Sequence, residues 1–330
     1  MSRLRRGSGA QGLLARWLAS PPPDAAIEIA PEGVSVAVLG SRGSEPVVEA
    51  FATASLPPGA VVPSLLSHNI VDRAAVAGAL RTACDRIGQR PRRAALVIPD
   101  LAARVSLVHF DQVPPRREDL DQLIRWQVKK SSPFPLDDAC VTYSPGARGA
   151  TGAEFVVVSA RRDTIREYEA ACDEAGMYAG LVDVATLSVV NLYLASAATP
   201  SGDWLVVHMR PEYTSIAIMR GRDLIFFRNR AEGEADGLAD VVHQTAMYYQ
   251  DRLEGTGFAR AFAGGTGRTS GALDVVRREI ESRVGTAVEM IDPTRAAVAT
   301  DRITVAADQL AALAPLVGML MRTRLEGVPA

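Results

Sequence analysis

The side chains that could support covalent or metal-dependent catalysis are few, and their spacing fits no catalytic motif. They comprise four histidines, three cysteines and two lysines: His68, His109, His208, His243, Cys84, Cys140, Cys172, Lys129 and Lys130. The cysteines are far apart and form no CxxC pair, which argues against a zinc site and a disulfide framework. The sequence also lacks a P-loop and a Gly-x-Ser-x-Gly turn. We therefore expect no catalytic residue and no metal site.

The composition indicates a chain that buries a large core and has no broad basic surface. It has 330 residues, 48% of them hydrophobic, which predicts about two domains. The 36 basic and 38 acidic residues leave a net charge of −2, which argues against nucleic-acid binding. Asp183 and Asn191 interrupt the longest apolar stretch, so we expect no membrane-spanning helix. These features predict a soluble cytoplasmic protein with reduced cysteines.

The first 23 residues differ from the rest of the chain. They contain four arginines and an apolar set at helical spacing, and the prolines at 21–23 end any helix there. They lack the apolar core of a signal peptide. One interpretation is a frayed tail with one helical turn docked on the body. The other is a basic amphipathic helix, within residues 1–20, that rests on the anionic inner leaflet of a membrane.

Two segments predict β-hairpins with related turns. Alternation of apolar residues covers residues 26–39 and 205–219, and each turn is a proline followed by a glutamate. The turn prolines, Pro31 and Pro211, are 180 residues apart, and four identities fall at that offset. This repeat indicates an internal duplication, which would fix the architecture of the protein.

The region between the hairpins alternates between helical and extended patterns. Apolar periodicity predicts a helix over residues 70–88 that ends at a glycine, followed by strands over 94–99 and 105–110. A second helix is predicted from residue 113 to about 130. Beyond it, two prolines flank Phe134, which we expect to plug into the apolar stripe of that helix.

Residues 105–145 carry the most specific pattern of the sequence. A proline and a glutamate open the helix, Ile-x-Trp follows, and Pro-Phe-Pro then precedes an acidic pair: Pro114, Glu118, Ile124, Trp126, Pro133, Phe134, Pro135, Asp137 and Asp138. Further blocks follow in order at 171–184, 224–233, 243–249, 262–293 and 314–322. Together they resemble the PilM family, the cytoplasmic actin-like component of type IV pilus assembly, over residues 24–325.

The resemblance implies an α/β protein with the actin-like (ribonuclease H-like) fold, built from duplicated domains with a small inserted α/β subdomain. On that basis residues 1–23 form a flexible basic segment and residues 24–200 form the first domain. The insert occupies about 105–161, and the second domain covers 201–330.

The resemblance also locates a nucleotide cleft between the two hairpin turns. In nucleotide-binding relatives each hairpin supplies Asp-x-Gly, because glycines let backbone N–H groups approach phosphates and aspartates hold hydrated magnesium. Here Glu28 and Ala30 replace the first pair, and His208 and Arg210 replace the second. The prolines also remove backbone donors, and the glutamates place negative charge beside the phosphates.

The candidates for a degenerate nucleotide cleft are Gly264, Gly265, Thr266, Thr214, Arg210 and Glu28. Two interpretations stay open. Either the cleft has lost its ligand, so that no cofactor and no ATP hydrolysis are expected, or it retains ATP with Mg²⁺ and Arg210 grips phosphate. The glycines can also serve only a tight turn from strand to helix.

For function, the resemblance implies a cytoplasmic scaffold or adaptor of the type IV pilus inner-membrane platform, peripheral to that membrane. Family members bind the cytoplasmic tail of a PilN-like single-pass protein in a groove between the first domain and the insert, and communicate with pilus motor ATPases and the platform protein. Our insert and groove candidates are Trp126, Phe134, Leu107 and Val105. The alternatives are an ATP-binding conformational switch of the same machine and an FtsA-like membrane-associated filament former, for which residues 324–330 offer no amphipathic anchor. A type II secretion-like machine is also open.

Overall fold

The computed structural model describes most of the chain beyond the N-terminal segment. The described residues are 23–43, 45–149, 152–196, 200–232, 237–267, 270–299 and 307–326. The expectations for residues 1–22, and for the final residues 327–330, therefore lie outside the described residues.

The protein builds two large sheets with the same strand order. The strands of the first are β1 (Ala25–Ala30), β2 (Gly33–Arg42), β3 (Glu45–Ser55), β4 (Arg93–Ile98), β8 (Tyr178–Val184) and β14 (Val298–Ala299), in the order β14-β3-β2-β1-β4-β8. Those of the second are β9 (Asp203–Met209), β10 (Tyr213–Arg220), β11 (Asp223–Ala231), β12 (Arg260–Gly265) and β13 (Val288–Met290), in the order β11-β10-β9-β12-β13. In each sheet a three-stranded antiparallel meander is extended by parallel strands. The predicted hairpins and the internal duplication are confirmed.

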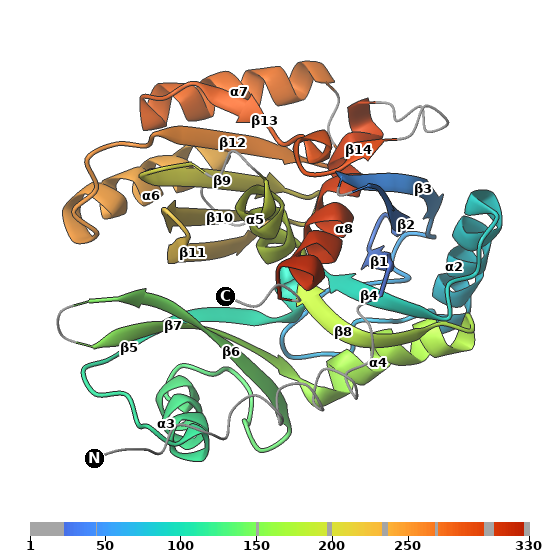
Figure 1. The fold of residues 1–330 in the computed structure, drawn as a ribbon, viewed down its shortest axis with the longest axis horizontal. Coiled ribbons are helices and arrows are strands. Elements are labelled where there is room, and N and C mark those ends of the chain that lie inside the picture. Colours follow the sequence, from blue (N-terminus) through green and yellow to red (C-terminus); the bar gives the residue numbers. More distant parts are fainter. Residues whose placement is uncertain are drawn as a thin grey trace, which may run out of the picture.

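Within the described residues, six helices cover the two sheets. Helices α2 (Arg73–Ile87) and α4 (Arg162–Glu174) lie on one face of the first sheet, and α6 (Leu238–Arg252) and α7 (Ser270–Val284) lie on the outer face of the second. Helices α5 (Ala185–Ala195) and α8 (Ala307–Glu326) lie between the two sheets, as Figure 1 shows. Two short 3₁₀ turns, η1 (Asp100–Ala102) and η2 (Pro293–Arg295), follow β4 and β13.

The alternation of side chains along the central strands explains why both sheet faces are covered. In β1, Ile27 and Ile29 face the core beneath α2 and α4, whereas the intervening Ala26 faces the core around α5 and α8. In β9, Leu205 points to the outer core and Trp204 to the shared inner core. Strands that are buried on both faces are expected where a parallel sheet carries helices on both sides.

A third, three-stranded sheet is inserted between η1 and α4. Its strands are β5 (Arg104–Phe110), β6 (Ala139–Arg148) and β7 (Ala153–Arg161), antiparallel in the order β5-β7-β6, and α3 (Arg117–Lys129) packs on one face. Phe134 is buried in the core beneath α3, as the sequence predicts. The helix begins four residues later than predicted, because the residues from 113 to 116 around the two prolines form bends rather than helix.

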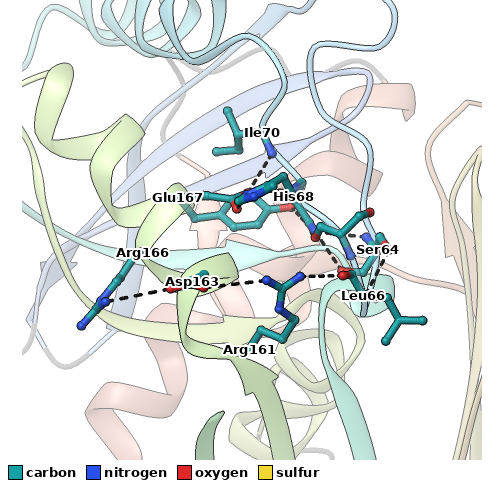
Figure 2. Close-up of polar contacts among 11 residues, drawn as sticks. Ser64, Leu66, His68, Ile70, Arg161, Asp163, Arg166 and Glu167 are labelled. Atoms are coloured by element: carbon teal, nitrogen blue, oxygen red, sulfur yellow. Dashed lines mark hydrogen bonds and ion pairs between the residues drawn. The ribbon is translucent and has the colours of Figure 1, made fainter. Parts of the chain in front are cut away.

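The loop before α2 fastens the inserted sheet to the first half (Figure 2). Glu167 of α4 accepts the backbone N–H groups of Asn69 and Ile70, at 2.7 and 3.1 Å, and pairs with His68. At the end of β7, Arg161 donates to the carbonyl of Leu66 at 2.6 Å. One loop thus joins the strand that leaves the insert to the helix that follows it.

Among the described residues, no helix combines the length and the apolar character that a membrane crossing requires.

Helix α8 packs against α5 through a glycine, and this close approach is testable. A Cβ at Gly318 would lie 1.8 Å from the carbonyl oxygen of Ser188, so Gly318→Ala forces the helices apart. Overpacking of this kind lowers the free energy of unfolding by about 1–3 kcal/mol. Gly78→Ala is the matched control, since that helical glycine has open space around it, and it raises stability by about 0.5–1 kcal/mol. Urea unfolding measures both; equal stabilities would contradict the helix contact.

Candidate functional site

The tips of the two duplicated hairpins meet at a buried arginine. Arg210 directly follows β9 and is 3% exposed. Its backbone N–H donates to the carbonyl of Tyr213 at 2.8 Å, which closes the tip of the second hairpin. Its side chain extends across to the first hairpin, so that one guanidinium links elements that are about half the chain apart.

The guanidinium binds three acceptors from three elements. Its Nη1 donates to Glu32 Oε1 and to Thr266 Oγ1, each at 3.0 Å, and its Nη2 donates to Glu28 Oε1. The Thr266 hydroxyl donates in turn to Glu32 at 2.5 Å. Glu28 lies in β1, Glu32 in the first turn and Thr266 just after β12. We call these four residues the tip cluster; it is a closed network of charged hydrogen bonds.

Protein atoms occupy the space next to the glycines beside the tip cluster. A Cβ at Gly265 would lie 1.6 Å from the Met209 carbonyl oxygen, and one at Gly264 would lie 2.9 Å from Ile291. Gly267 has a φ of +78° and packs against Pro211. These glycines allow the end of β12 to approach the second hairpin, and protein atoms occupy the space that their missing side chains leave.

The residues present do not fit a magnesium triphosphate between the tips. The guanidinium of Arg210 occupies that position and is surrounded by Glu28 and Glu32. Prolines 31 and 211 supply no backbone N–H. In the described part of the chain, no group of three His, Cys, Asp or Glu side chains could hold a metal ion. Actin-like ATPases in general bind nucleotide with Mg²⁺, but the chemistry of these tips opposes an anionic ligand.

A second polar cluster lies deeper, behind the tip cluster. Asp100 follows β4 and is 1% exposed. Its carboxylate accepts the hydroxyl and the backbone N–H of Thr186 at the start of α5, and the hydroxyl of Ser215 in β10 at 2.6 Å. Burial raises the pKa of Asp100, and the hydrogen bonds from Ser215 and Thr186 partly oppose this effect. Because Asp100 sits at the N-terminus of α5, its charge is favourable to the helix dipole.

His208 completes this deeper cluster in a defined tautomer. The Thr186 hydroxyl donates its single proton to Asp100, so at 2.8 Å it accepts a hydrogen bond from Nδ1–H of His208. Nε2 is then unprotonated, buried and without a partner among the described residues. Burial lowers the pKa of His208 to about 4, so this imidazole is neutral near pH 7.

The structure brings most of the sequence candidates for the cleft together. Arg210 binds both Glu28 and Thr266 directly, and the glycines 264 and 265 lie beside them on β12. Thr214 is buried in β10, opposite Met209. The sequence analysis gave no bonding role to Glu32 or Asp100. An acidic residue two positions after the buried strand β4 was the available signal for Asp100.

A separate cavity of about 470 Å³ opens where the inserted sheet meets both larger sheets. We call it the groove. Its lining comes from β6 and β7, from β8 and α5, from the β10–β11 hairpin and from α8: Thr142–Gly146, Val156, Val158, Leu181–Asp183, Leu187, Val190, Asn191, Leu194, Met219, Arg222, Leu224 and Arg322. Arg322 pairs with Asp183 in its wall, and Arg222 donates to the Leu194 carbonyl at 3.1 Å. The groove is therefore lined by polar and apolar groups in about equal measure, and its charged side chains are Asp183, Arg222 and Arg322.

The four partner-binding candidates fall in different places. Val105 and Leu107 pair with Val158 and Val156 of the groove, so they share its face of the sheet. Phe134 is buried in the core beneath α3. Trp126 is 59% exposed on α3, with the Lys130 ammonium 3.6 Å from its ring centroid, and does not line the groove.

The repeated strand order, the two facing hairpins and the inserted sheet define an actin-like fold. The structure is similar to that of a PilM-PilN type IV pilus biogenesis complex, with a TM-score of 0.77 at 17% identity over 94% of this chain and 100% of that chain. The cytoplasmic domain of EpsL, an inner membrane component of the type II secretion system of Vibrio cholerae, gives 0.47 at 10% identity over 93% and 95%. An actin-like protein of unknown function from Bacteroides thetaiotaomicron gives 0.46 at 10% identity over 81% and 89%.

The family model for the type IV pilus assembly protein PilM matches residues 26–256, more than half of the chain. The protein therefore belongs to the PilM family and has a role in type IV pilus assembly.

The buried imidazole predicts a defined pH dependence. Below pH 6.5 an unfolded histidine takes up a proton, whereas folded His208 resists protonation down to about pH 4, so acid favours unfolding. Between pH 6.5 and 5 this removes about 2 kcal/mol from the unfolding free energy. In His208→Asn the amide can still donate to Thr186, and the loss with falling pH should be smaller by that amount. Asp100 titrates in both proteins, so its opposite contribution largely cancels.

The measurement is urea unfolding at several pH values. His243→Asn is the matched control, because His243 is exposed on α6, and it should keep the wild-type pH dependence. An unchanged slope in His208→Asn would contradict the neutral, buried imidazole.

Proposed function

We propose that this protein is a scaffold of the pilus machine that captures a short cytoplasmic tail of a PilN-like inner-membrane protein in the groove. The observation that carries the proposal is the position of the groove, where the inserted sheet meets both halves of the protein. Its lining combines apolar side chains such as Val156 and Val158 with charged ones, which suits an amphipathic peptide.

Strand β6 supplies one route of binding. It is an edge strand, since the sheet order is β5-β7-β6. Five consecutive residues of β6, Thr142 to Gly146, line the groove. Because successive side chains point to opposite faces, a continuous run of lining residues means that the strand's backbone edge borders the groove. An extended tail could add to that edge through main-chain hydrogen bonds, with its apolar side chains toward Val156 and Val158.

The walls of the groove are held in place before a ligand arrives. The loop contacts of Glu167 and Arg161 fasten the insert, and the close approach of α8 at Gly318 holds α5. A preformed site lowers the entropic cost of ordering a flexible tail. This arrangement supports an adaptor in which the folded protein is rigid and its partner's tail becomes ordered.

The same proposal places the protein at the cytoplasmic face of the inner membrane, brought there by its partner. We treat residues 24–200, with the insert at about 105–161, and residues 201–330 as its two domains. Contacts with the motor ATPases and the platform protein would then use surfaces outside the groove.

A substitution that fills the groove tests the proposal. Thr142 is exposed and lines the groove, and tryptophan suits a strand, so Thr142→Trp should keep the fold and weaken capture of the tail at least tenfold. Thr82→Trp is the matched control, on an exposed position of α2 away from the groove, and should bind normally. Fluorescence anisotropy with the labelled cytoplasmic tail of the PilN-like protein from the same organism measures the affinity.

Trp126→Ala separates the two candidate surfaces on the insert. If the tail occupies the groove, this variant binds as the wild type does, because Trp126 does not line it. A loss of binding in Trp126→Ala together with normal binding in Thr142→Trp would indicate that the tail binds at α3, and would contradict binding in the groove.

A further inference from the structure

We infer that Arg210 is a built-in substitute for a bound nucleotide, so that the two halves of this protein are tied at their hairpin tips by the chain itself. The inference goes beyond the scaffold function and does not depend on it. It concerns what holds the cleft closed, whereas the groove lies elsewhere in the fold.

The first step is the bridging geometry. A nucleotide between two hairpins joins the halves because its phosphates bind both tips. Here one guanidinium does so, with Glu28 and Glu32 on the first hairpin and its own backbone in the second. Its third acceptor, Thr266, adds the end of β12. The planar fork of an arginine is suited to several acceptors at once, which a lysine ammonium would hold less rigidly.

The charges at the hairpin tips are the reverse of those in a nucleotide site. In a nucleotide site an anionic ligand is surrounded by backbone donors and a cation. In this protein the pattern is inverted, with a cation at the centre and Glu28 and Glu32 around it. Glu212, on the other tip, lies near enough for Glu32 to raise its pKa, after burial as the larger cause. A phosphate entering here would have to displace the guanidinium and would then meet these carboxylates.

The guanidinium of Arg210 is not available to bind phosphate. Both of its Nη atoms are engaged within the tip cluster, and the side chain is 3% exposed. Its Nε–H is buried without a partner among the described residues, and one such donor does not make a phosphate site. Releasing the guanidinium would leave two carboxylates unpaired, one of them buried, which is strongly unfavourable.

The experiment compares the wild type with Arg210→Ala and Arg220→Ala. Arg220 is the matched control: it pairs with Asp203 at 2.8 Å in the same hairpin, but both partners belong to the second sheet. Arg210→Ala should lower the Tm by about 10 °C, and Arg220→Ala by less than about 3 °C. Hydrogen–deuterium exchange should accelerate at least tenfold in residues 26–39 and 205–219 of Arg210→Ala only.

The second part of the experiment tests whether the wild type binds nucleotide. Mg-ATP at 1 mM, a concentration of about the order that saturates ordinary ATP sites, should leave the Tm and the exchange of the wild type unchanged. Saturable Mg-ATP binding that raises the wild-type Tm would overturn the inference. So would an Arg210→Ala variant whose exchange matches that of Arg220→Ala. If Arg210→Ala fails to fold, Glu32→Gln tests the same bridge from the half-buried carboxylate, and unchanged exchange at both tips would refute it.

Discussion

A guanidinium buried between two carboxylates fixes how the halves of this protein meet. Removing the charges of Arg210 and Glu28 from water is unfavourable, and their mutual attraction largely repays that cost only when the geometry is good. The Arg210 cluster therefore adds little net stability compared with an apolar contact of the same size. What it adds is specificity, because any other placement of the hairpins leaves a buried charge without its partner.

Helix α5 extends from the deeper polar cluster to the groove. The N-terminus of α5 is held by Asp100, whose carboxylate also accepts the hydroxyl of Ser215 from the second hairpin. The other end of α5 carries Asn191 and Leu194, which line the groove. One rigid helix thus connects the polar clusters at the tips with the proposed peptide site.

The sequence predicted local features well and long-range partners poorly. The hairpins and the position of Phe134 followed from alternation and from proline placement, which are local signals. Glu32 was interpreted as a turn residue whose charge opposes phosphate and not as a partner of Arg210, because Arg210 is 178 residues away. The glycines near 264 could equally serve phosphate binding or close packing. Only the approach of Met209 to Gly265 distinguishes the two, and no periodicity encodes that contact.

The internal duplication places like charges at the two hairpin tips, and the positive charge of Arg210 lies at these tips. At the 180-residue offset, Glu32 corresponds to Glu212, so a symmetric pair of tips places like charges opposite each other. A ligand with a bound cation can reduce the repulsion between such tips. A substitution in one repeat that introduces a positive charge can do the same. Ala30 has diverged from its equivalent, Arg210, whose guanidinium extends to Glu28 and Glu32 of the first hairpin. Glu28 has likewise diverged from His208, which turns instead toward Thr186. The asymmetry of these two pairs converts a site for a shared ligand into a contact between the halves.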